Sequence, residues 1–544
     1  MPRAEYDVVI VGAGHNGLVA GNYLADAGLK VIVVEAAAKV GGMTTTEVGA
    51  IPEAPQHKTN PCAVDPIWWE AFPASRDLDL GRYGLRFKPL DPCYAYLHPD
   101  GDSIAFWRDP RRTAEEISHF SKPDAAAYLD FVRFLDGFYE LTSPLANTSP
   151  TKPGLGAVGQ ASKAALKHRK QLGAYGAFYL SSGAEVINEW FEHPMVRNGL
   201  HVMSGAFYPS TMAGSTFLLI AVPMFHRIDT GRPIGGTGAI TEALAKRLAA
   251  AGGTIRTSSP VREIIVSKNR ATGVCLTDGT VLEAGRAVLA TCDPVTALTR
   301  LLPPGTLPSK LEGRTKAIPT FSGGAGVVKV DVALNGQLDL SKYNKKRRDG
   351  LDMRLPSHFI GHEEGLQRAY ARCAAGLLPD PTDFGAWNCI PTAHDPSQAP
   401  EGQDTLYIWS SLAPVSPDEG WDNVKDKMGQ IAIDSAALHY SGIADFELGR
   451  LVQTHEDIAR KKWCEGTRGG VMHVDHVLSR TGPLRPALGL AGYTTPVGGL
   501  YLGGAGSHPG GGVTGAPGHN SAKEILRGLR KETSPRRIRN RRSV

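Results

Sequence analysis

The chain opens with two short apolar runs that flank a glycine-rich turn and a helical pattern. Tyr6 to Val11 is a largely apolar run of the kind that forms a buried parallel strand, and Val31 to Val34 is a second one. Between them, Gly12, Gly14 and Gly17 form G-x-G-x-x-G and are followed by residues with helical periodicity. This order predicts a strand, a tight turn, a helix and a second strand.

The glycines and the acid that follows them predict the ligand of this βαβ unit. The first glycine permits the tight turn, the second lets the backbone approach a pyrophosphate, and the third lets helix and strand pack closely. Glu35 stands at the carboxyl end of the second strand, 18 residues after Gly17. A carboxylate there accepts hydrogen bonds from ribose hydroxyls and repels a 2′-phosphate. The segment therefore predicts a site for FAD or NAD and disfavours NADP.

Two later regions have the pattern of segments that return to the same domain. Residues 233–238 open a helical pattern over 239–251, and alternating apolar residues over 254–277 with an Asp278-Gly279 turn predict strands and a hairpin. Residues 499–518 predict a strand and a very glycine-rich loop, with a helix from about Asn520. Such a loop lets backbone amides approach a flat polar ligand, and the alternative is a flexible linker.

Together these motifs resemble a known family. The N-terminal motif with the further pair Gly41-Gly42, the segment around Gly236, and residues 287–294, 469–473 and 504–518 are similar to the phytoene-desaturase-related flavoproteins. The last segment most resembles the branch of ketolase-type carotenoid oxidoreductases and the pyridine nucleotide-disulfide oxidoreductase domain-containing protein 2 group. The resemblance covers nearly the whole chain and implies FAD as the cofactor.

The resemblance also implies which residues contact FAD. Those at the adenosine and diphosphate would be Gly12, Gly14, Gly17, Glu35, Gly41 and Gly42. Val261 would lie near the adenine. Those along the ribityl chain and isoalloxazine would be Gly504, Gly506, Gly511, Gly512 and Val513.

The expected fold is α/β, with a Rossmann-type FAD-binding domain of the glutathione-reductase and amine-oxidase type and an inserted α+β substrate domain. At 544 residues, two or three domains are expected. We assign residues 1–75, 232–300 and 485–530 to a discontinuous FAD-binding domain, and residues 76–231 and 301–484 to a substrate or cap domain. Residues 124–135 predict an amphipathic helix and 144–153 a loop, but 150–225 match no pattern of the family.

Cysteine usage and the start of the chain bear on location. The seven cysteines include no C-x-x-C, which argues against a redox-active disulfide and is typical of a reducing compartment. The first residues run directly into the first strand, so we expect no secretion signal. The expected location is cytoplasmic, with peripheral membrane contact at most.

Two segments are relevant to membrane contact. No apolar run reaches the ~18 residues of a transmembrane helix. Residues 216–225 are interpreted as a buried wall of the substrate cavity, and a loop that dips into a membrane surface is the alternative. The lysine- and arginine-rich residues 163–170 are interpreted as a solvated helix face, and membrane contact is again the alternative.

The net charge of +5 comes from the C-terminal end. Residues 527–544 carry +7, which leaves −2 for the first 526 residues. We expect residues 531–544 to be a basic, disordered tail that is solvated, with acidic lipids or nucleic acid as alternative contacts. We find no nucleic-acid motif and predict no nucleic-acid partner.

Candidate catalytic residues are less specific than the cofactor motif. A flavin accepts a hydride, so the protein must place a C–H bond over its ring and supply a base if a proton leaves too. Candidate bases or orienting groups are His508, His473 and His226, and a purely structural histidine is the alternative for each. The 17 histidines include no H-x-x-x-H with acidic companions, so no metal site is expected.

The leading hypothesis is an FAD-dependent desaturase or dehydrogenase that acts on CH–CH bonds. Its partner would be an apolar or alicyclic small molecule, including one that bears a carbonyl, and O2 or a quinone would reoxidise the flavin. The alternatives are an amine-oxidase-like or carotenoid-ketolase-like oxidation, and a flavin-binding interaction protein without catalysis. The sequence leaves the substrate and the oligomeric state open.

Overall fold

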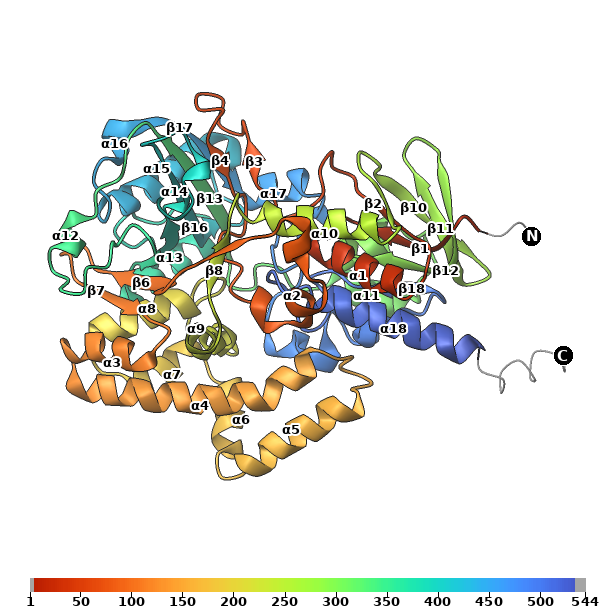
Figure 1. Cartoon of the computed structure of the whole chain (residues 1–544), viewed down its shortest axis with the longest axis horizontal. Helices are drawn as coiled ribbons and strands as arrows, with labels where there is room; N and C mark the ends of the chain where they lie inside the picture. Colours follow the sequence, from red (N-terminus) through yellow and green to blue (C-terminus); the bar gives the residue numbers. More distant parts are fainter. Residues whose placement is uncertain (1–3, 534–544) are drawn as a thin grey trace.

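Two seven-stranded sheets, each covered by helices, form the molecule (Figure 1). The structure is a computed structural model and describes residues 4–533. Each sheet has its own hydrophobic packing, and the larger cluster of buried side chains belongs to the second sheet and its helices. The expected α/β architecture with a Rossmann-type sheet is confirmed.

The first sheet has the strand order β10-β11-β12-β1-β2-β9, and β18 pairs with β12. Its strands are β1 (Tyr6–Val11), β2 (Val31–Val34), β9 (Thr254–Arg256), β10 (Val261–Ser267), β11 (Arg270–Leu276), β12 (Val281–Ala290) and β18 (Leu500–Leu502). β1 lies at the centre and pairs in parallel with β2 and β12. All seven strands fall within the segments 1–75, 232–300 and 485–530, and the predicted turn at Asp278-Gly279 joins β11 to β12.

Three helices cover the first sheet near the glycine motif. They are α1 (His15–Asp26), α10 (Gly238–Ala250) and α18 (Ala516–Thr533), and α1 packs against both of the others. The helix predicted from about Asn520 begins four residues earlier, because Pro517 in the first turn costs the helix no hydrogen bond. The predicted tail is also corrected, since α18 continues to Thr533, and residues 534–544 lie outside the described residues.

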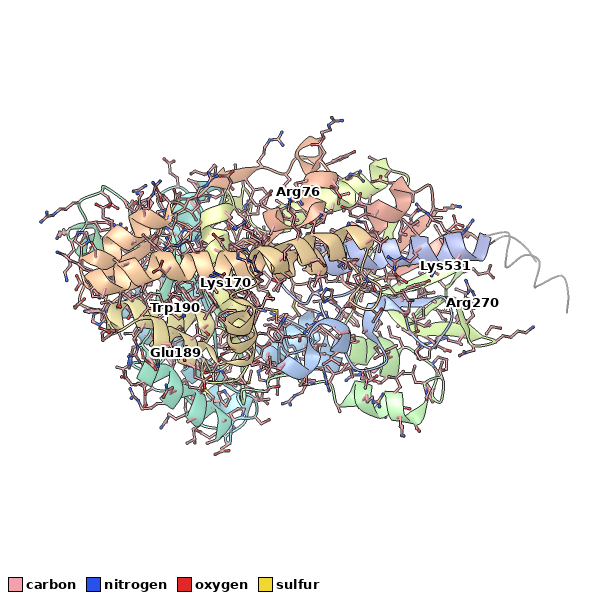
Figure 2. The ribbon with its side chains drawn as sticks, turned by 90° about the horizontal axis from the view of Figure 1, so that it is seen from below. Arg76, Lys170, Glu189, Trp190, Arg270 and Lys531 are labelled. Carbon is pink, nitrogen blue, oxygen red and sulfur yellow. The ribbon has the colours of Figure 1, made fainter. Side chains whose placement is uncertain are left out.

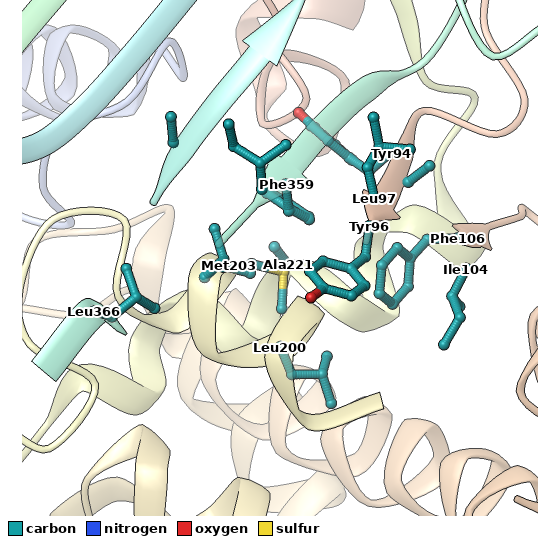
Figure 3. Packing of buried hydrophobic residues seen from close by; sticks show 14 of the residues in the cluster. Tyr94, Tyr96, Leu97, Ile104, Phe106, Leu200, Met203, Ala221, Phe359 and Leu366 are labelled. Atoms are coloured by element: carbon teal, nitrogen blue, oxygen red, sulfur yellow. The ribbon is translucent and has the colours of Figure 1, made fainter. Parts of the chain in front are cut away.

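The second sheet has the order β17-β13-β16-β15-β14-β6-β7 and is antiparallel except where β14 pairs with β6. Its strands are β6 (Tyr94–Leu97), β7 (Ser103–Phe106), β13 (Ala325–Leu334), β14 (Ser357–Ile360), β15 (Ala386–Cys389), β16 (Asp404–Pro414) and β17 (Glu447–Thr454). β13 and β16 are buried along their whole length, so both faces of the sheet are covered there. Figure 3 shows Tyr96 of this sheet beside α8 (Pro194–Ser204), the covering helix that carries Leu200 and Met203.

Residues that matched no family pattern form most of a helical cap. Its helices are α3 (Pro110–Ser118), α4 (Lys122–Ala146), α5 (Leu155–Lys167), α6 (Leu172–Leu180), α7 (Gly183–Trp190), α8 (Pro194–Ser204) and α9 (Ala221–Arg227), with a 3-10 turn at Ser215–Ile220. The predicted helix over 124–135 is confirmed within α4. The predicted loop at 144–153 begins later, because α4 continues past Pro144 to Ala146.

Short elements connect these layers. They are the pair β3 (Glu47–Val48) and β4 (Lys58–Thr59), the pair β5 (Phe87–Pro89) and β8 (Gly231–Pro233), and the helices α2 (Pro73–Asp77), α11 (Ser309–Lys316), α12 (Ser341–Asn344), α13 (Glu363–Ala374), α14 (Pro391–His394), α15 (Trp421–Ala437), α16 (Ile443–Phe446) and α17 (His455–Lys461). Within residues 4–533, no helix has both the length and the apolar character to cross a bilayer.

A buried ion pair links one connecting strand to the second sheet. Arg232 of β8 is 2% exposed, and its Nε donates to Oδ1 of buried Asp65 at 2.6 Å. Its Nη2 donates to Ser357 Oγ at 2.8 Å, at the start of β14, and Nη1 donates to the Leu355 carbonyl at 3.1 Å. One guanidinium therefore joins three segments that are distant in sequence.

We expect Arg232→Met to destabilise the protein by about 3–5 kcal/mol, because it leaves the Asp65 carboxylate buried without its cation. The measurement is the free energy of unfolding from chemical denaturation. The matched control is Arg300→Met, which removes a pair with Glu465 whose side chains are 50% and 55% exposed. The control should cost no more than ~1 kcal/mol. Equal losses for the two variants would contradict a special contribution of the buried pair.

Candidate functional site

A cavity of about 760 Å³ joins the glycine motif of the first sheet to the aromatic side chains of the second. This volume lies within the usual range for small-molecule and cofactor sites. Partly exposed residues line the cavity in two regions, and from their exposure we infer an opening in each. Trp463 marks one of them, and Leu145 and Tyr179 mark the other.

The glycine motif forms a cradle at one end of the cavity. At Gly17, a Cβ atom would lie 2.0 Å from the Gly12 carbonyl oxygen, so strand and helix leave no room for a side chain. At Gly14, the nearest protein atom to a Cβ would be the Gly41 oxygen at 4.0 Å, and Gly14 lines the cavity. Gly17 therefore serves packing, whereas the space at Gly14 belongs to the cavity. The N-terminus of α1 faces this space and favours an anionic ligand.

The predicted acid lies at the same end of the cavity. Glu35 is buried, its Oε2 accepts from the Ala13 amide at 2.7 Å, and its Oε1 accepts from the Ala37 amide at 2.9 Å. These bonds hold the carboxylate at the edge of the cradle, and each oxygen keeps a lone pair for a ribose hydroxyl. Val261 lines the cavity beside Ser259 on the neighbouring segment. Gly41 and Gly42 line the cavity as well.

The glycine-rich loop near the C-terminus divides into two parts. Gly511, Gly512 and Val513 line the cavity. Gly504 and Gly506 are not among the lining residues, because there a Cβ would lie 2.3 Å from the Thr291 oxygen and 2.6 Å from Pro294. The first part of the loop therefore packs against the segment after β12, and the second part faces the cavity.

Four histidines line the cavity, two of which were not predicted. His473 and His508 were candidates, and His15 and His476 join them. Among the described residues, one ring nitrogen of each is buried without a hydrogen-bond partner: His15 Nε2, His473 Nδ1, His476 Nε2 and His508 Nδ1. Buried polar atoms without partners are costly, so these four unpartnered nitrogen atoms fit a cavity that holds a polar ligand. His15 follows the second motif glycine directly, and His476 follows His473 by three residues, which are the only local signals.

Burial keeps these imidazoles neutral. It lowers the pKa of His15 and of His508 to about 4, and the pKa of His473 and His476 also lies below the ordinary value. The Arg485 cation further disfavours protonation of His473, His476 and His508. At neutral pH each ring can therefore accept one hydrogen bond or one proton.

Arg485 connects the segments that carry these histidines. The side chain is 1% exposed, and its Nη1 donates to the carbonyls of Asp475 and Arg480 at 3.2 and 3.3 Å. Its Nη2 donates to the carbonyls of Met472, Val474 and Ala505 at 3.1, 2.9 and 3.1 Å. The guanidinium therefore ties the segment with His473 and His476 to the glycine-rich loop, and burial lowers its pKa to about 10.

His226 lies elsewhere. It is not among the lining residues, its Nδ1 is 2.8 Å from the Trp107 carbonyl oxygen, and its Nε2 is 2.9 Å from the Tyr128 hydroxyl. Both ring nitrogens thus have partners within the cap. This environment favours a structural histidine over a base in the cavity.

The far end of the cavity is apolar and aromatic. The segment 216–225, interpreted as a cavity wall, contributes side chains here, and the second sheet supplies the facing wall. The lining residues at this end include Phe217, Ile220, Met224, Phe225, Phe359, Trp387, Tyr407 and Trp409. Among the described lining residues, the carboxylates are Glu35, Asp65, which is paired with Arg232, and Asp293, whose Oδ1 accepts from the Thr296 amide at 2.8 Å.

The residues present fit FAD. The cradle at Gly14, the held carboxylate of Glu35 and the unpartnered histidine nitrogens suit a dinucleotide with a polar ring system. No group of three or more His, Cys, Asp or Glu side chains within residues 4–533 is arranged to hold a metal ion.

Comparison with known proteins agrees with this geometry. Residues 180–526 match the family described as flavin containing amine oxidoreductase, and residues 7–96 match the family described as FAD dependent oxidoreductase. The crystal structure of an oxidoreductase from Methanosarcina mazei has the same fold, with a TM-score of 0.59 and 16% identity over 96% of this chain and 99% of that one.

Curated relatives align over almost their whole length. Pyridine nucleotide-disulfide oxidoreductase domain-containing protein 2 of Rattus norvegicus is 27% identical over 97% of this chain and 94% of its own. One subunit of the limonene dehydrogenase from Castellaniella defragrans is 26% identical, over 96% of this chain and 95% of its own. The neurosporene-forming phytoene desaturase of Rhodobacter capsulatus is 26% identical, over 93% of this chain and 90% of its own. The predicted resemblance and cofactor are confirmed, and the protein is an FAD-dependent oxidoreductase.

We expect Gly14→Val to fold but to purify without flavin, because its side chain fills cavity space rather than protein. Gly17→Val should instead destabilise the fold by ~3 kcal/mol or more, because its Cβ meets the Gly12 oxygen. Flavin absorbance of the purified proteins and their unfolding free energies separate the two effects. Full FAD occupancy in Gly14→Val would show that the cofactor does not approach this glycine.

Proposed function

This chain belongs to the flavin containing amine oxidoreductase family, and from that membership we propose that it is a dehydrogenase or desaturase acting on apolar or alicyclic small molecules. It would remove a hydride and a proton from adjacent C–H bonds and leave a C=C bond. The proposed substrates include molecules that carry a carbonyl beside the reacting carbons. O2 or a quinone is the proposed electron acceptor.

The observation that supports this proposal is the composition of the cavity. One end fits a dinucleotide, and the other end is walled by aromatic and aliphatic side chains such as Phe225, Phe359 and Trp387. A wall of this kind stabilises an apolar ligand by removing its surface from water. Two of the aligned relatives carry hydrocarbons in their names, limonene and phytoene, which agrees with such a ligand.

Bound FAD would supply the hydride acceptor. The chain's own residues would hold the cofactor at Gly14 and Glu35, keep the substrate in place with the aromatic walls, and exclude water. His476 stacks on Phe217 with ring centroids 4.4 Å apart, so it closes the wall near the histidines. A neutral imidazole of His508 or His473 would accept the departing proton at its unpartnered Nδ1.

An amine-oxidase-like reaction is the second candidate, because it is the chemistry in the family description. A protonated amine is best bound beside a carboxylate. Of the described lining carboxylates, Glu35 lies at the cradle and Asp65 is paired with Arg232, whereas Asp293 accepts from the Thr296 amide through Oδ1 and keeps Oδ2 buried without a partner. The wall that the second sheet supplies is made of aromatic residues and carries no carboxylate among the described lining residues, which favours an uncharged substrate there. A ketolase-like oxidation and a flavin-binding protein without catalysis are further outcomes that the same experiment separates.

The experiment is an anaerobic titration of the FAD-loaded protein with a panel of compounds. The panel contains a cyclic monoterpene hydrocarbon, a long polyene, a cyclic ketone and a primary amine, and bleaching of the flavin absorbance is followed in time. We expect bleaching by a member of the first three classes, with a C=C bond gained in the product. Bleaching by the amine alone, or by none of the compounds, would contradict the proposal. Mixing the reduced protein with O2 or with a soluble quinone then identifies the acceptor.

We expect His508→Ala to keep the flavin spectrum and to slow flavin reduction by ~10²-fold or more, because a base usually contributes on this scale. His473→Ala tests the other lining candidate in the same assay. His226→Ala is the comparison, since its ring lies outside the cavity lining. Unchanged reduction in His508→Ala, or an equal loss in His226→Ala, would assign His508 a structural role only.

A further inference from the structure

Two helices that follow one another in the cap, α5 and α6, both carry exposed leucines. Leu155 is 91% exposed, Leu166 67% and Leu180 62%. Leu155 and Leu166 lie eleven residues apart, about three helical turns, so they share one face of α5. Ala164 lies on the opposite, buried face. In Figure 1, α5 and α6 form the lower edge of the molecule.

The second helix of the pair has no charged side chain. α6 spans Leu172–Leu180, and only Tyr175 and Phe178 of its residues are buried. Its remaining side chains are small or apolar and exposed. Single exposed apolar residues are normal on protein surfaces, but a contiguous patch of them marks an interaction site.

The chain segment that carries these helices has charges of one sign, and Glu140 of α4 lies beside it. Residues 141–184 contain five lysines and arginines and no aspartate or glutamate. Lys163, Arg169 and Lys170 are exposed, whereas Lys167 pairs with Glu140 at 2.8 Å. Figure 2 looks onto this side of the molecule and labels Lys170. The patch thus combines apolar side chains with cations that favour an anionic surface.

The cavity opens beside the same patch. Tyr179 of α6 is 41% exposed and lines the cavity, as does Leu145 of α4, which is 38% exposed. The Tyr179 hydroxyl is hydrogen-bonded to Thr481, another lining residue. A binding partner that covers the patch would therefore lie next to this opening.

We propose that α5 and α6 dock the protein on the surface of an anionic lipid bilayer. An interfacial helix buries its apolar face at the headgroup boundary and keeps its cations at the lipid phosphates, and Leu155, Leu166 and Leu180 with Lys163, Arg169 and Lys170 provide both parts. The sequence alone had favoured a solvated face for residues 163–170. The exposed leucines among and beside them change that interpretation.

Docking in this orientation would place the opening at Tyr179 against the lipid phase. A lipophilic substrate could then pass from the bilayer into the cavity without crossing water. This second step rests on the proposed apolar substrate, whereas docking itself does not. The two are tested separately, because vesicle binding requires no turnover.

The test is co-sedimentation of the full-length, FAD-loaded protein with vesicles of phosphatidylcholine alone or mixed with phosphatidylglycerol. We expect binding to the anionic vesicles. Leu155→Ser/Leu166→Ser/Leu180→Ser should weaken it by ~10-fold or more, because interfacial binding scales with buried apolar area. Lys163→Glu/Arg169→Glu/Lys170→Glu should also weaken it by ~10-fold or more, because each removed cation is worth roughly five-fold.

Two matched controls carry the same substitutions elsewhere on the surface. Leu377→Ser/Leu438→Ser/Leu448→Ser changes three leucines that are 43%, 42% and 37% exposed. Lys268→Glu/Lys310→Glu/Arg348→Glu reverses three exposed cations. Both controls should bind vesicles like the natural protein. Every variant keeps the same C-terminal segment, so any vesicle binding by that segment contributes equally to all of them.

Several results would overturn the proposal. They are the absence of sedimentation with anionic vesicles, equal losses in the patch and control variants, and retention of full binding by the leucine variant. Binding of the natural protein that disappears completely at ~1 M salt would also contradict it, because salt screens the cations but not the buried leucines. Unaltered flavin content in every variant shows that the fold and the FAD site are intact.

Discussion

The arrangement of the loops that carry three of the cavity's histidines depends on one buried cation. The Arg485 guanidinium is removed from water, and carbonyl oxygens from residues 472–480 and from Ala505 take the place of its hydration. Carbonyl dipoles satisfy the donors but leave a positive charge, which adds to the effect of burial in lowering the pKa of His473, His476 and His508. One side chain thus holds two loops together and helps to keep the histidines they carry neutral.

The two ends of the cavity recognise their ligands by different means. At the cradle, recognition depends on backbone amides and on the absence of side chains at Gly12 and Gly14, so few other sequences could form it. At the apolar end, the space for the proposed ligand is set by side-chain volume, from residues such as Phe225 and Trp387 that also pack in the core of the second sheet. The alignment of differently named relatives over nearly their whole length agrees with this division.

The parts that were predictable from the sequence are those whose physical cause is local. β1, α1 and β2 follow from apolar runs and from glycines that only a tight turn requires, and Glu35 follows from its place after a strand. His15 and His476 were missed because nothing beside them in the sequence distinguishes a lining histidine from a packed one. Gly504 and Gly512 likewise look alike in sequence, and only their surroundings, Thr291 for one and the cavity for the other, give them different roles. The cap helices between 150 and 225 carry no motif, so their arrangement emerges only from tertiary packing.

The parallel ladder of the first sheet has a consequence for biosynthesis. β12 joins β1 from the beginning of the chain to β18 near its end, and Gly518 of α18 packs directly on the backbone of Asn16 in α1. Because a ribosome releases the chain from its N-terminus, β1 and α1 emerge hundreds of residues before the partners that complete them. The nascent cradle must therefore wait, with apolar edges exposed, for long-range closure, which is the slow kind of contact. The cradle around the glycine motif is therefore completed only after β12, β18 and α18 have been synthesised, so FAD can be bound only late in synthesis.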